Sequence, residues 1–539
     1  MDGSHTRPGS DDIKKLPHVD ISFMNYGYTG VMAKHAWFDK LWGLRHLGQT
    51  DTPASEGLVL SGGGSRASFH IGALRYLYEN SHIAPRSIVS TSAGSIVAAM
   101  LAQSLDPGEQ LTNLGILEDY WMAMTDPSEM FTEQAWFTRL REQWGEISSV
   151  IPEPVISDPI FDSADSSTAE HLVKQAIAMD PSTQDSDFSL PSFWRLLGAL
   201  PRIGKIGAGL ANTLHGAERA ASAYRPGPIV QRLLFESGFS ATAVAQSGVQ
   251  LRMAFVGLKT GDLRFMRQDG FIVDTDDQLV DLVPYDISLG VWASCALPGV
   301  FRPVVLGDDA YVDGGVRDNV PVEMAVSTLG VTKPYVIAAT PPGVGHADLS
   351  STDMVSVLMR TFSILVDEAI RDEVAWARRA GAVVIEPEVD VHASMVVDNT
   401  LMRINRDYGW MCAAEEMTNP DTRVSGPITL ARMELYRVES SPDSELLAPD
   451  LSHPDAVHAV LSPVAPSSGS STGPDPASNG HGISAHLNLP FRRIDTVEDA
   501  ASPISRDDLV RSAREHLRTL LDCADPALLP SDYRSWPEE

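Results

Sequence analysis

The alternation of hydrophobic and polar positions is most regular between residues 57 and 105. A short apolar run over 57–61 stops at three glycines, and residues 67–79 then place apolar side chains at helical intervals. A second apolar run over 87–90 is followed by a helical pattern over 93–105. This order of strand, helix, strand and helix predicts a βαβα unit, and therefore a parallel sheet with helices on its faces.

Regular patterns return after residue 250. Residues 251–266 predict a hairpin that turns at 259–262, because two apolar runs flank a Lys-Thr-Gly-Asp segment. Further along the chain the pattern predicts strands over 310–312, 334–340 and 382–385, a long helix over 353–380, and a last helix that follows Ser505 and has apolar residues at 509, 513, 517 and 520.

Two long segments lack such patterns. Residues 106–250 are polar and irregular in period, which favours an insertion over a core. Residues 461–482 contain 14 Ser, Pro or Gly in 22 positions, a composition that cannot bury enough apolar surface to fold. We therefore expect an N-terminal extension over 1–50, a main domain over 51–440 with an insertion or lid over about 106–250, a disordered linker over 441–490, and a short helical tail over 491–539.

Composition narrows the class of protein. The 539 residues include 41 Lys and Arg against 71 Asp and Glu, a net charge of −30, whereas a nucleic-acid surface needs clustered cations. The same sign opposes whole-molecule attraction to anionic lipid but leaves a local basic patch open. The hydrophobic share of 43% is that of a soluble globular protein with a sizeable core.

Cofactors and targeting segments are not indicated. Cys295, Cys412 and Cys523 are too few and too scattered for a disulfide framework or a zinc site, so we expect no metal and no other cofactor. The first 15 residues lack the apolar stretch of a signal peptide, and no run of about 18 apolar residues follows. The sequence predicts a cytoplasmic protein and leaves peripheral membrane binding open.

Ser92 is the candidate nucleophile. A strict G-x-S-x-G match at 469–473 lies inside the Ser/Pro/Gly segment with no strand before it and no helix after it, so we reject it. The imperfect match Ser90-Thr-Ser-Ala-Gly94 follows an apolar strand and opens a helix, which places Ser92 at an exposed elbow near a helix N-terminus. An ordinary turn with a capping serine is the alternative interpretation.

The glycine run Gly62-Gly-Gly-Ser-Arg66 is the candidate oxyanion loop. It lies between a strand and a helix, where consecutive backbone N–H groups can stabilise a developing negative charge. The alternatives are a plain turn or a phosphate-binding loop. A P-loop needs G-K-[ST], and a dinucleotide site needs an acidic residue about 20 positions further on; Ala67 leaves only a loose match to the latter.

Asp313 is the candidate base. It ends the short strand 310–312, and the two glycines after it, Gly314 and Gly315, let the chain turn away and leave the carboxylate at the site. An ordinary Asp-Gly turn is again the alternative. The small residues of 292–301, where Pro298 stops a predicted helix, suit close packing beneath such a site.

Together these motifs resemble those of the patatin-like phospholipase family, in a bacterial form with a large insertion and a C-terminal extension. That family has a Gly-Gly-Gly-x-Arg-Gly loop, a G-x-S-x-G elbow, an Ala-Ser-x-Ala-x-Pro-x-x-Phe-x-Pro segment and an Asp-Gly-Gly or Asp-Gly-Ala box. All four occur in this order between residues 62 and 315, and the third is complete at 293–303. The resemblance covers roughly residues 56–390.

The resemblance implies a fold and a reaction. The fold would be a three-layer αβα patatin-like core with a mainly parallel central sheet, a helical insertion and a C-terminal helical tail. The reaction would be hydrolysis of fatty-acyl esters of phospholipids or related lipids, with no cofactor. The implied roles are the nucleophile Ser92, its base Asp313 in a two-residue dyad, the oxyanion loop Gly62, Gly63, Gly64 and Arg66, and the turn residues Gly94, Gly314 and Gly315.

Departures from the family pattern keep two other functions open. Ala67 and Ser90 replace family glycines, which puts substrate preference and turnover in more doubt than the fold. One alternative is a non-catalytic lipid-binding or regulatory protein on the same fold. The other is an α/β-hydrolase triad, because Ser92, Asp313 and His346 occur in the Ser, Asp, His order of that class.

A hydrolase of aggregated lipid must reach a membrane or micelle surface, and two segments run against the acidic average. Residues 193–225 carry five basic side chains against Glu218, a net charge of +4, among aromatic, aliphatic and glycine residues. Residues 34–47 place Trp37 and Trp42 beside basic side chains. Each segment is either a lipid-facing segment or a helix packed on the core with snorkelling basic residues. The sequence does not indicate an oligomeric state.

Overall fold

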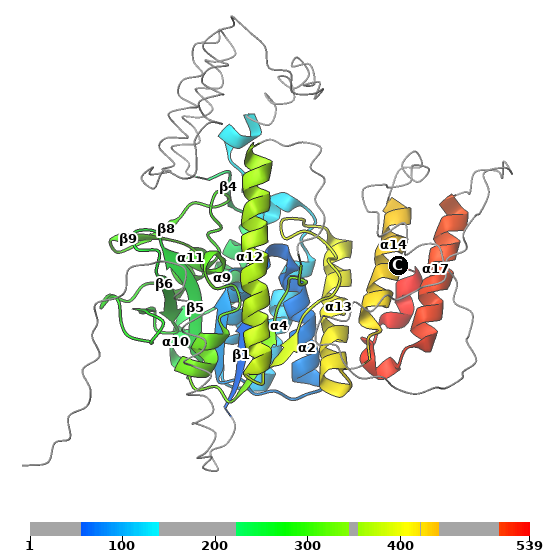
Figure 1. The fold of residues 1–539 in the computed structure, drawn as a ribbon, viewed down its shortest axis with the longest axis horizontal. Helices are drawn as coiled ribbons and strands as arrows, with labels where there is room; N and C mark the ends of the chain where they lie inside the picture. The colour runs from blue at the N-terminus through cyan, green and yellow to red at the C-terminus, as the bar shows by residue number, and fades with distance from the viewer. Residues whose placement is uncertain (1–54, 140–221, 344–353, 421, 441–505, 539) are drawn as a thin grey trace, which may run out of the picture. The chain divides into compact units, whose positions relative to one another are not determined.

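The computed structural model describes residues 55–139, 222–343, 354–420, 422–440 and 506–538 (Figure 1). The predicted βαβα unit is confirmed, with the elements β1 (Glu56–Leu60), α2 (Ala67–Glu79), β2 (Ser87–Thr91) and α3 (Ala93–Leu101). The apolar run of β1 buries Leu58, Val59 and Leu60 completely, and the run therefore behaves as an interior strand with both faces covered.

The later predictions are also confirmed, within a few residues at the ends. They correspond to the hairpin of β5 (Gln250–Gly257) and β6 (Leu263–Arg267), and to β9 (Asp309–Asp313), β10 (Lys333–Ile337), α12 (Met354–Arg379), β11 (Val383–Ile385) and α17 (Arg506–Cys523). Helix α11 (Ile287–Ser294) ends shortly before Pro298. Elements that the pattern did not predict are β3 (Phe131–Glu133), β4 (Tyr224–Pro226), α9 (Pro228–Phe235), α10 (Ala241–Gln246), β7 (Ile272–Val273), β8 (Val304–Leu306), α13 (Asn399–Thr418), α14 (Ser425–Ser440) and α4 (Pro107–Met122).

A mixed sheet forms the middle layer. Strands β11, β10, β1, β2 and β5 are neighbours in this order and pair in parallel. Strands β6, β7, β8 and β9 extend the β5 side in antiparallel fashion. The expectation of a mainly parallel sheet therefore holds for the strands that carry the βαβα unit, and the other end of the sheet is antiparallel.

Helices cover both faces of this sheet. Leu58 and Leu60 join a buried cluster with residues of α2, α3, α4 and α13, whereas Val59 points to the opposite face and is also buried. On that second face, the short helix η6 (Met324–Thr328) contacts β1 and β2, and α12 contacts β11. The result is the three-layer αβα arrangement of a patatin-like fold.

The boundary expected at residue 106 is wrong. Helix α4 begins directly after it, with the Asp106 side chain accepting from the Glu109 amide, and buries Leu114, Leu117 and Trp121 completely. These residues follow helical spacing, but polar residues separate them so widely that the stretch does not look periodic in sequence. The core therefore continues to Met122, and α9 at the other end of the expected insertion also buries Ile229 and Leu233.

The C-terminal helix belongs to the same helical layer. Helices α2, α13, α14 and α17 each contact the next, and Figure 1 shows them in this order from blue through yellow to red. Helix α17 buries Leu517 and Leu521, and further on the ring of Trp536 lies under the guanidinium of Arg432 at 3.8 Å. The predicted helical tail is thus packed on α14.

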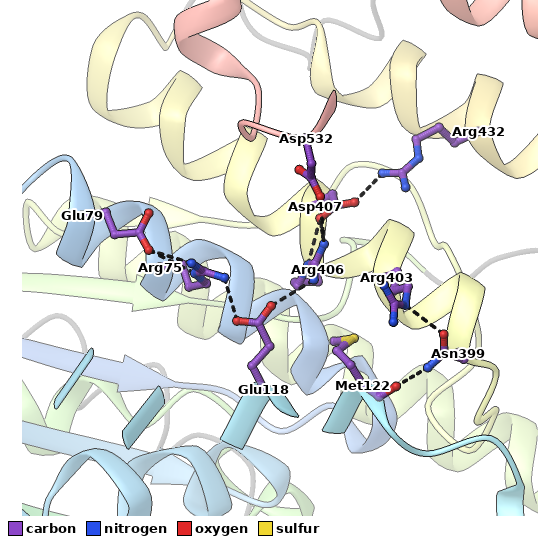
Figure 2. A network of polar contacts seen from close by, with 10 residues as sticks. All are labelled: Arg75, Glu79, Glu118, Met122, Asn399, Arg403, Arg406, Asp407, Arg432 and Asp532. Carbon is purple, nitrogen blue, oxygen red and sulfur yellow. Dashed lines mark hydrogen bonds and ion pairs between the residues drawn. The ribbon is translucent and has the colours of Figure 1, made fainter. Parts of the chain in front are cut away.

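A network of charged side chains joins the helices of this layer (Figure 2). Asp407 on α13 accepts hydrogen bonds from the guanidinium groups of Arg406 at 2.6 Å and Arg432 at 2.7 Å. Glu118 on α4 accepts from Arg406 at 2.9 Å and from Arg75 of α2 at 3.0 Å. Each of these largely buried carboxylates therefore has two cationic partners.

Candidate active site

The register of the sheet brings Ser92 and Asp313 together. Strand β5 pairs with β2 up to Ala254, opposite Thr91, and its next residue, Phe255, pairs with Asp313 of β9. Phe255 also pairs with β6, so β9 must lie on the edge of β5 that β2 has just left. Residue 92 follows the end of β2, and the side chain of Ser92 lies close enough to the carboxylate of Asp313 to lower the pKa of that carboxyl.

The backbone at Ser92 forms a sharp strand-to-helix turn. Its φ of 53° and ψ of −131° lie in a region that residues with a side chain seldom adopt. Two residues later, a Cβ on Gly94 would lie 2.6 Å from the carbonyl oxygens of Leu60 and Ser61, so α3 can approach the end of β1 only with glycine there. This is the elbow geometry that the motif predicts, and the Ser92 side chain remains partly exposed.

A chain of buried serines supports the elbow from below. Ser294 donates to the Ala254 carbonyl at 2.7 Å and accepts the Ser92 backbone N–H at 2.9 Å. Ser95 lies 2.9 Å from Ser294 and 3.0 Å from Ser90, and since the Ser294 proton is used, the hydroxyl of Ser95 donates to it. Ser90, which departs from the family glycine, thus takes part in the support of the elbow.

Asp313 is a buried carboxylate whose partners, among the described residues, are neutral. Its side chain is 3% exposed and accepts the Gly315 backbone N–H at 2.8 Å. Burial raises the pKa of Asp313 to about 6, and the hydrogen bonds from Ser92 and Gly315 limit the rise. Burial, together with the negative charge of Asp313, raises the pKa of the neighbouring Cys295 thiol, so Cys295 remains a thiol. Gly314 passes so close to Ala254 that a Cβ would lie 2.7 Å from its carbonyl oxygen.

The three glycines of the loop differ in what their backbone amides do. The Gly62 N–H donates to the Asn319 side-chain oxygen at 3.0 Å and lies 3.3 Å from the Asn319 carbonyl oxygen. The amides of Gly63 and Gly64 have no acceptor among the residues that the structure describes. Gly64 has φ +59°, and a Cβ there would lie 2.3 Å from the Ser394 carbonyl oxygen. Gly63 and Gly64 therefore supply the free donors of this loop.

Arg66 points away from these free amides. Its guanidinium donates to the His392 carbonyl at 2.7 Å and to the Asp390 carboxylate at 2.6 Å. The backbone carbonyl of Ser394, close by in the same segment as Asp390 and His392, also accepts the Ser65 N–H at 2.9 Å. Arg66 was expected to act in the oxyanion loop. Its side chain instead ties the loop to the segment that contains Asp390 and His392.

Sequence reasoning missed Asn319, the residue that joins the glycine loop to the Asp313 box. It stands six positions after Asp313 in a segment with no period, and its side chain is 8% exposed. The neighbouring Asp318 shares a buried site with Glu373 of α12, and burial together with the negative charge of Glu323 raises the pKa of Asp318 to about 7. An Asn a few residues after an Asp-Gly-Gly box is the kind of sequence feature that would have pointed to it.

Four expectations lie wholly or mostly outside the described residues: the triad candidate His346, the segment 34–47, the segment 193–225 apart from its last residues 222–225, and the rejected serine motif at 469–473. Within the described part, no group of three or more His, Cys, Asp and Glu side chains is placed to hold a metal ion. None of the helices described there is long and apolar enough to cross a membrane.

Comparisons with known proteins agree with the motifs. Residues 58–326 match the family model described as patatin-like phospholipase. None of the curated proteins compared with the chain matches it.

Solved structures similar to this chain include VipD from Legionella pneumophila, at 14% identity and a TM-score of 0.28 over 73% of this chain and 79% of that one. The type III effector protein ExoU matches at 14% identity and a TM-score of 0.23, over 73% of this chain and 60% of that one. The ExoU–SpcU complex from the type III secretion system of Pseudomonas aeruginosa matches at 14% identity and a TM-score of 0.19, over 74% of this chain and 72% of that one.

Proposed function

Since residues 58–326 form a patatin-like phospholipase domain, we propose that this chain is a serine lipid acyl hydrolase that cleaves fatty-acyl esters of phospholipids or related lipids. The observation that carries the proposal is the closeness of Ser92, at a strained elbow, to the buried carboxylate of Asp313, whose pKa its side chain lowers. A hydroxyl is a weak nucleophile unless a base accepts its proton, and the Asp313 carboxylate is in place to do so.

The proposed reaction has two steps. Asp313 accepts the Ser92 proton, the Ser92 oxygen attacks the ester carbonyl, and the N–H groups of Gly63 and Gly64 stabilise the oxyanion. The alcohol part of the lipid leaves with a proton from Asp313, and water then releases the fatty acid from the acyl-enzyme. Because Asp313 must be ionised and its pKa is about 6, kcat/KM is expected to rise as the pH passes about 6.

The closeness of Ser92 to Asp313 supports the dyad over a triad. In a Ser-His-Asp triad the imidazole stands between the serine and the carboxylate. Here the Ser92 side chain is near enough to the Asp313 carboxylate to lower its pKa. Replacing His346 by Ala tests the point, and loss of esterase activity in a folded His346→Ala protein would refute the dyad.

Covalent labelling tests the function itself. Purified protein is treated with a fluorophosphonate probe, and fatty-acid release from phosphatidylcholine vesicles is measured in parallel. Wild type and Ser87→Ala are expected to react, because Ser87 is a buried serine at the other end of β2 that bonds Gln250. Ser92→Ala is expected to lose both signals. A wild type that neither reacts nor releases fatty acid would instead indicate a non-catalytic lipid-binding protein.

A further inference from the structure

Asn319 lies between the two glycine motifs of the site. Its side-chain oxygen accepts the Gly62 N–H at 3.0 Å. Its side-chain nitrogen lies 2.8 Å from the position that a Cβ would take on Gly62, and 2.8 Å from the corresponding position on Gly315. One carboxamide thus fills the space that any side chain at either glycine would need.

The orientation of this amide follows from its partner. Gly62 offers an N–H donor, so the atom facing it must be the oxygen Oδ1, and the nitrogen Nδ2 must point the other way. That side is where the dyad lies, because a Cβ on Gly62 would be 3.0 Å from the Ser92 Cβ and one on Gly315 would be 3.2 Å from the Asp313 Oδ1. The amide therefore borders both catalytic candidates.

The backbone around Asn319 is held by two further elements. Thr91, the residue before the elbow serine, donates its hydroxyl to the Asp318 carbonyl at 3.0 Å. The carboxylate of Glu373 on α12 accepts the N–H of Asn319 at 3.3 Å and that of Val320 at 2.8 Å. A side chain on so fixed a backbone can hold its neighbours at a defined spacing.

We propose that Asn319 is a positioning residue of the hydrolase site, a role that rests on the proposed function. It anchors the Gly62 amide, so that the next two amides of the loop face the carbonyl attacked by Ser92, and it sets the distance between that loop and Gly315. On this assignment the first glycine of the loop is the anchor and not an oxyanion donor. The second glycine of the Asp313 box is required to make room for the amide.

The kinetic consequence is a loss in kcat. Asn319→Ala removes the shorter, side-chain contact of the Gly62 N–H, leaves only the 3.3 Å contact with the Asn319 carbonyl and so loosens the two donor amides. The loss of one well-placed oxyanion donor lowers kcat by about 10²–10³-fold in measured cases. KM should stay nearly constant, because oxyanion donors act on the transition state and not on the bound ester. Gln110→Ala is the matched control: this amide is fully buried and bonded to Tyr78 and Ser104, but it lies on α4 away from the site.

Hydrogen–deuterium exchange tests the anchor without relying on turnover. Peptides covering 56–66 and 311–317 are followed in full-length wild type, Asn319→Ala, Asn319→Asp and Gln110→Ala, alongside hydrolysis of p-nitrophenyl butyrate. Both peptides should exchange faster in Asn319→Ala. In Asn319→Asp the first peptide should stay protected, because the carboxylate keeps an oxygen for the Gly62 N–H. Gln110→Ala should match wild type in these two peptides.

The outcomes separate this proposal from the proposed function. Wild-type exchange in the 56–66 peptide of Asn319→Ala overturns the anchor, whether or not any ester is hydrolysed. Faster exchange with wild-type kcat overturns the positioning role. If wild type hydrolyses nothing and does not react with the fluorophosphonate, the proposed function fails, and the exchange data still support or overturn the contact between Asn319 and Gly62.

Discussion

The candidate active site around Asp313, called the catalytic edge below after its proposed role, and the helical layer of α2, α4, α13, α14 and α17 bury carboxylates in opposite ways. In the helical layer, Asp407 is 2% exposed and accepts from the guanidinium groups of Arg406 and Arg432 (Figure 2). At the catalytic edge, Asp313 is 3% exposed and meets a serine hydroxyl and a backbone amide, with no ion pair among the described residues. Burial is nearly equal, and the partners differ.

This difference separates structural from chemical uses of a buried charge. A paired carboxylate has its desolvation offset by its cations and can hold helices together. A carboxylate without a cation keeps the cost of desolvation, which raises its pKa and strengthens it as a base. Burial also raises the pKa of Asp318 and of Glu373 at this edge, although the nearby charge of Arg317 limits the rise for Asp318.

Removing the base is the strongest way to test the comparison. Asp313→Asn keeps the shape of the side chain but cannot accept the Ser92 proton, so kcat should fall by about 10²–10⁴-fold. Asp309→Asn, on the same strand but bonded to surface amides, should keep its kcat. Steady-state hydrolysis of a p-nitrophenyl ester measures both, and equal rates for the two variants would contradict a catalytic Asp313.

Removing a cation from the helical layer should affect stability and not chemistry. Arg432→Ala leaves the buried Asp407 with one fewer cation and exposes the ring of Trp536, so the free energy of unfolding should fall by about 3–5 kcal/mol. Arg437→Ala breaks an exposed pair with Glu434 and should cost under about 1 kcal/mol. Denaturant titration measures both. A loss of kcat in folded Arg432→Ala would contradict the expectation that this region affects stability and not chemistry.

The unpaired carboxylate should also make stability depend on pH. The pKa of Asp313 is about 6 in the folded protein against 3.8 for a free side chain. Its ionisation therefore lowers the free energy of unfolding as the pH rises from 3.8 to about 6, and has no effect below pH 3.8. Asp313→Asn should therefore be more stable than wild type at pH 8, by up to about 3 kcal/mol, and gain nothing near pH 3.5. Unfolding curves at the two pH values decide this, and a pH-independent difference would speak against an unpaired charge.

The pair of Asp318 and Glu373 should give the smallest effect. Because these pKa values are raised, the folded pair holds a proton that the unfolded carboxyls have already released, so stability falls as the pH rises towards about 7 and levels off above it. Glu373→Gln removes one ionisable group and one acceptor of the loop amides, so stability at pH 6 should change by about 1 kcal/mol. The slope of stability against pH below about 7 should flatten, and an unchanged slope would show that the pair does not titrate there.

Much of the fold was predictable because its core strands are short, uniformly apolar and bounded by glycine or serine. The run over 57–61 and the helix over 67–79 appear in the structure almost as predicted. Helix α4 was missed because a helix that buries only one stripe, including Leu114 and Trp121, carries polar residues at most other positions. Where a helix is covered on one side only, composition alone resembles that of a loop.

The site was predictable only where a motif is local. Ser92 and Asp313 could be proposed from the glycines beside them, and the structure brings the two side chains into contact. The contact between Asn319 and Gly62 joins residues 257 positions apart, and Glu373 reaches the same loop from another helix. Such contacts depend on how strands stack in the sheet, which no single segment of sequence encodes.

The turn at Ser92 has one further consequence. Its backbone holds a φ of 53°, a conformation that glycine adopts freely and that costs other residues about 1–3 kcal/mol. Glycine at this position would relieve the strain. What glycine cannot provide is the hydroxyl, so the strain of this turn is the cost of holding the candidate nucleophile at the elbow.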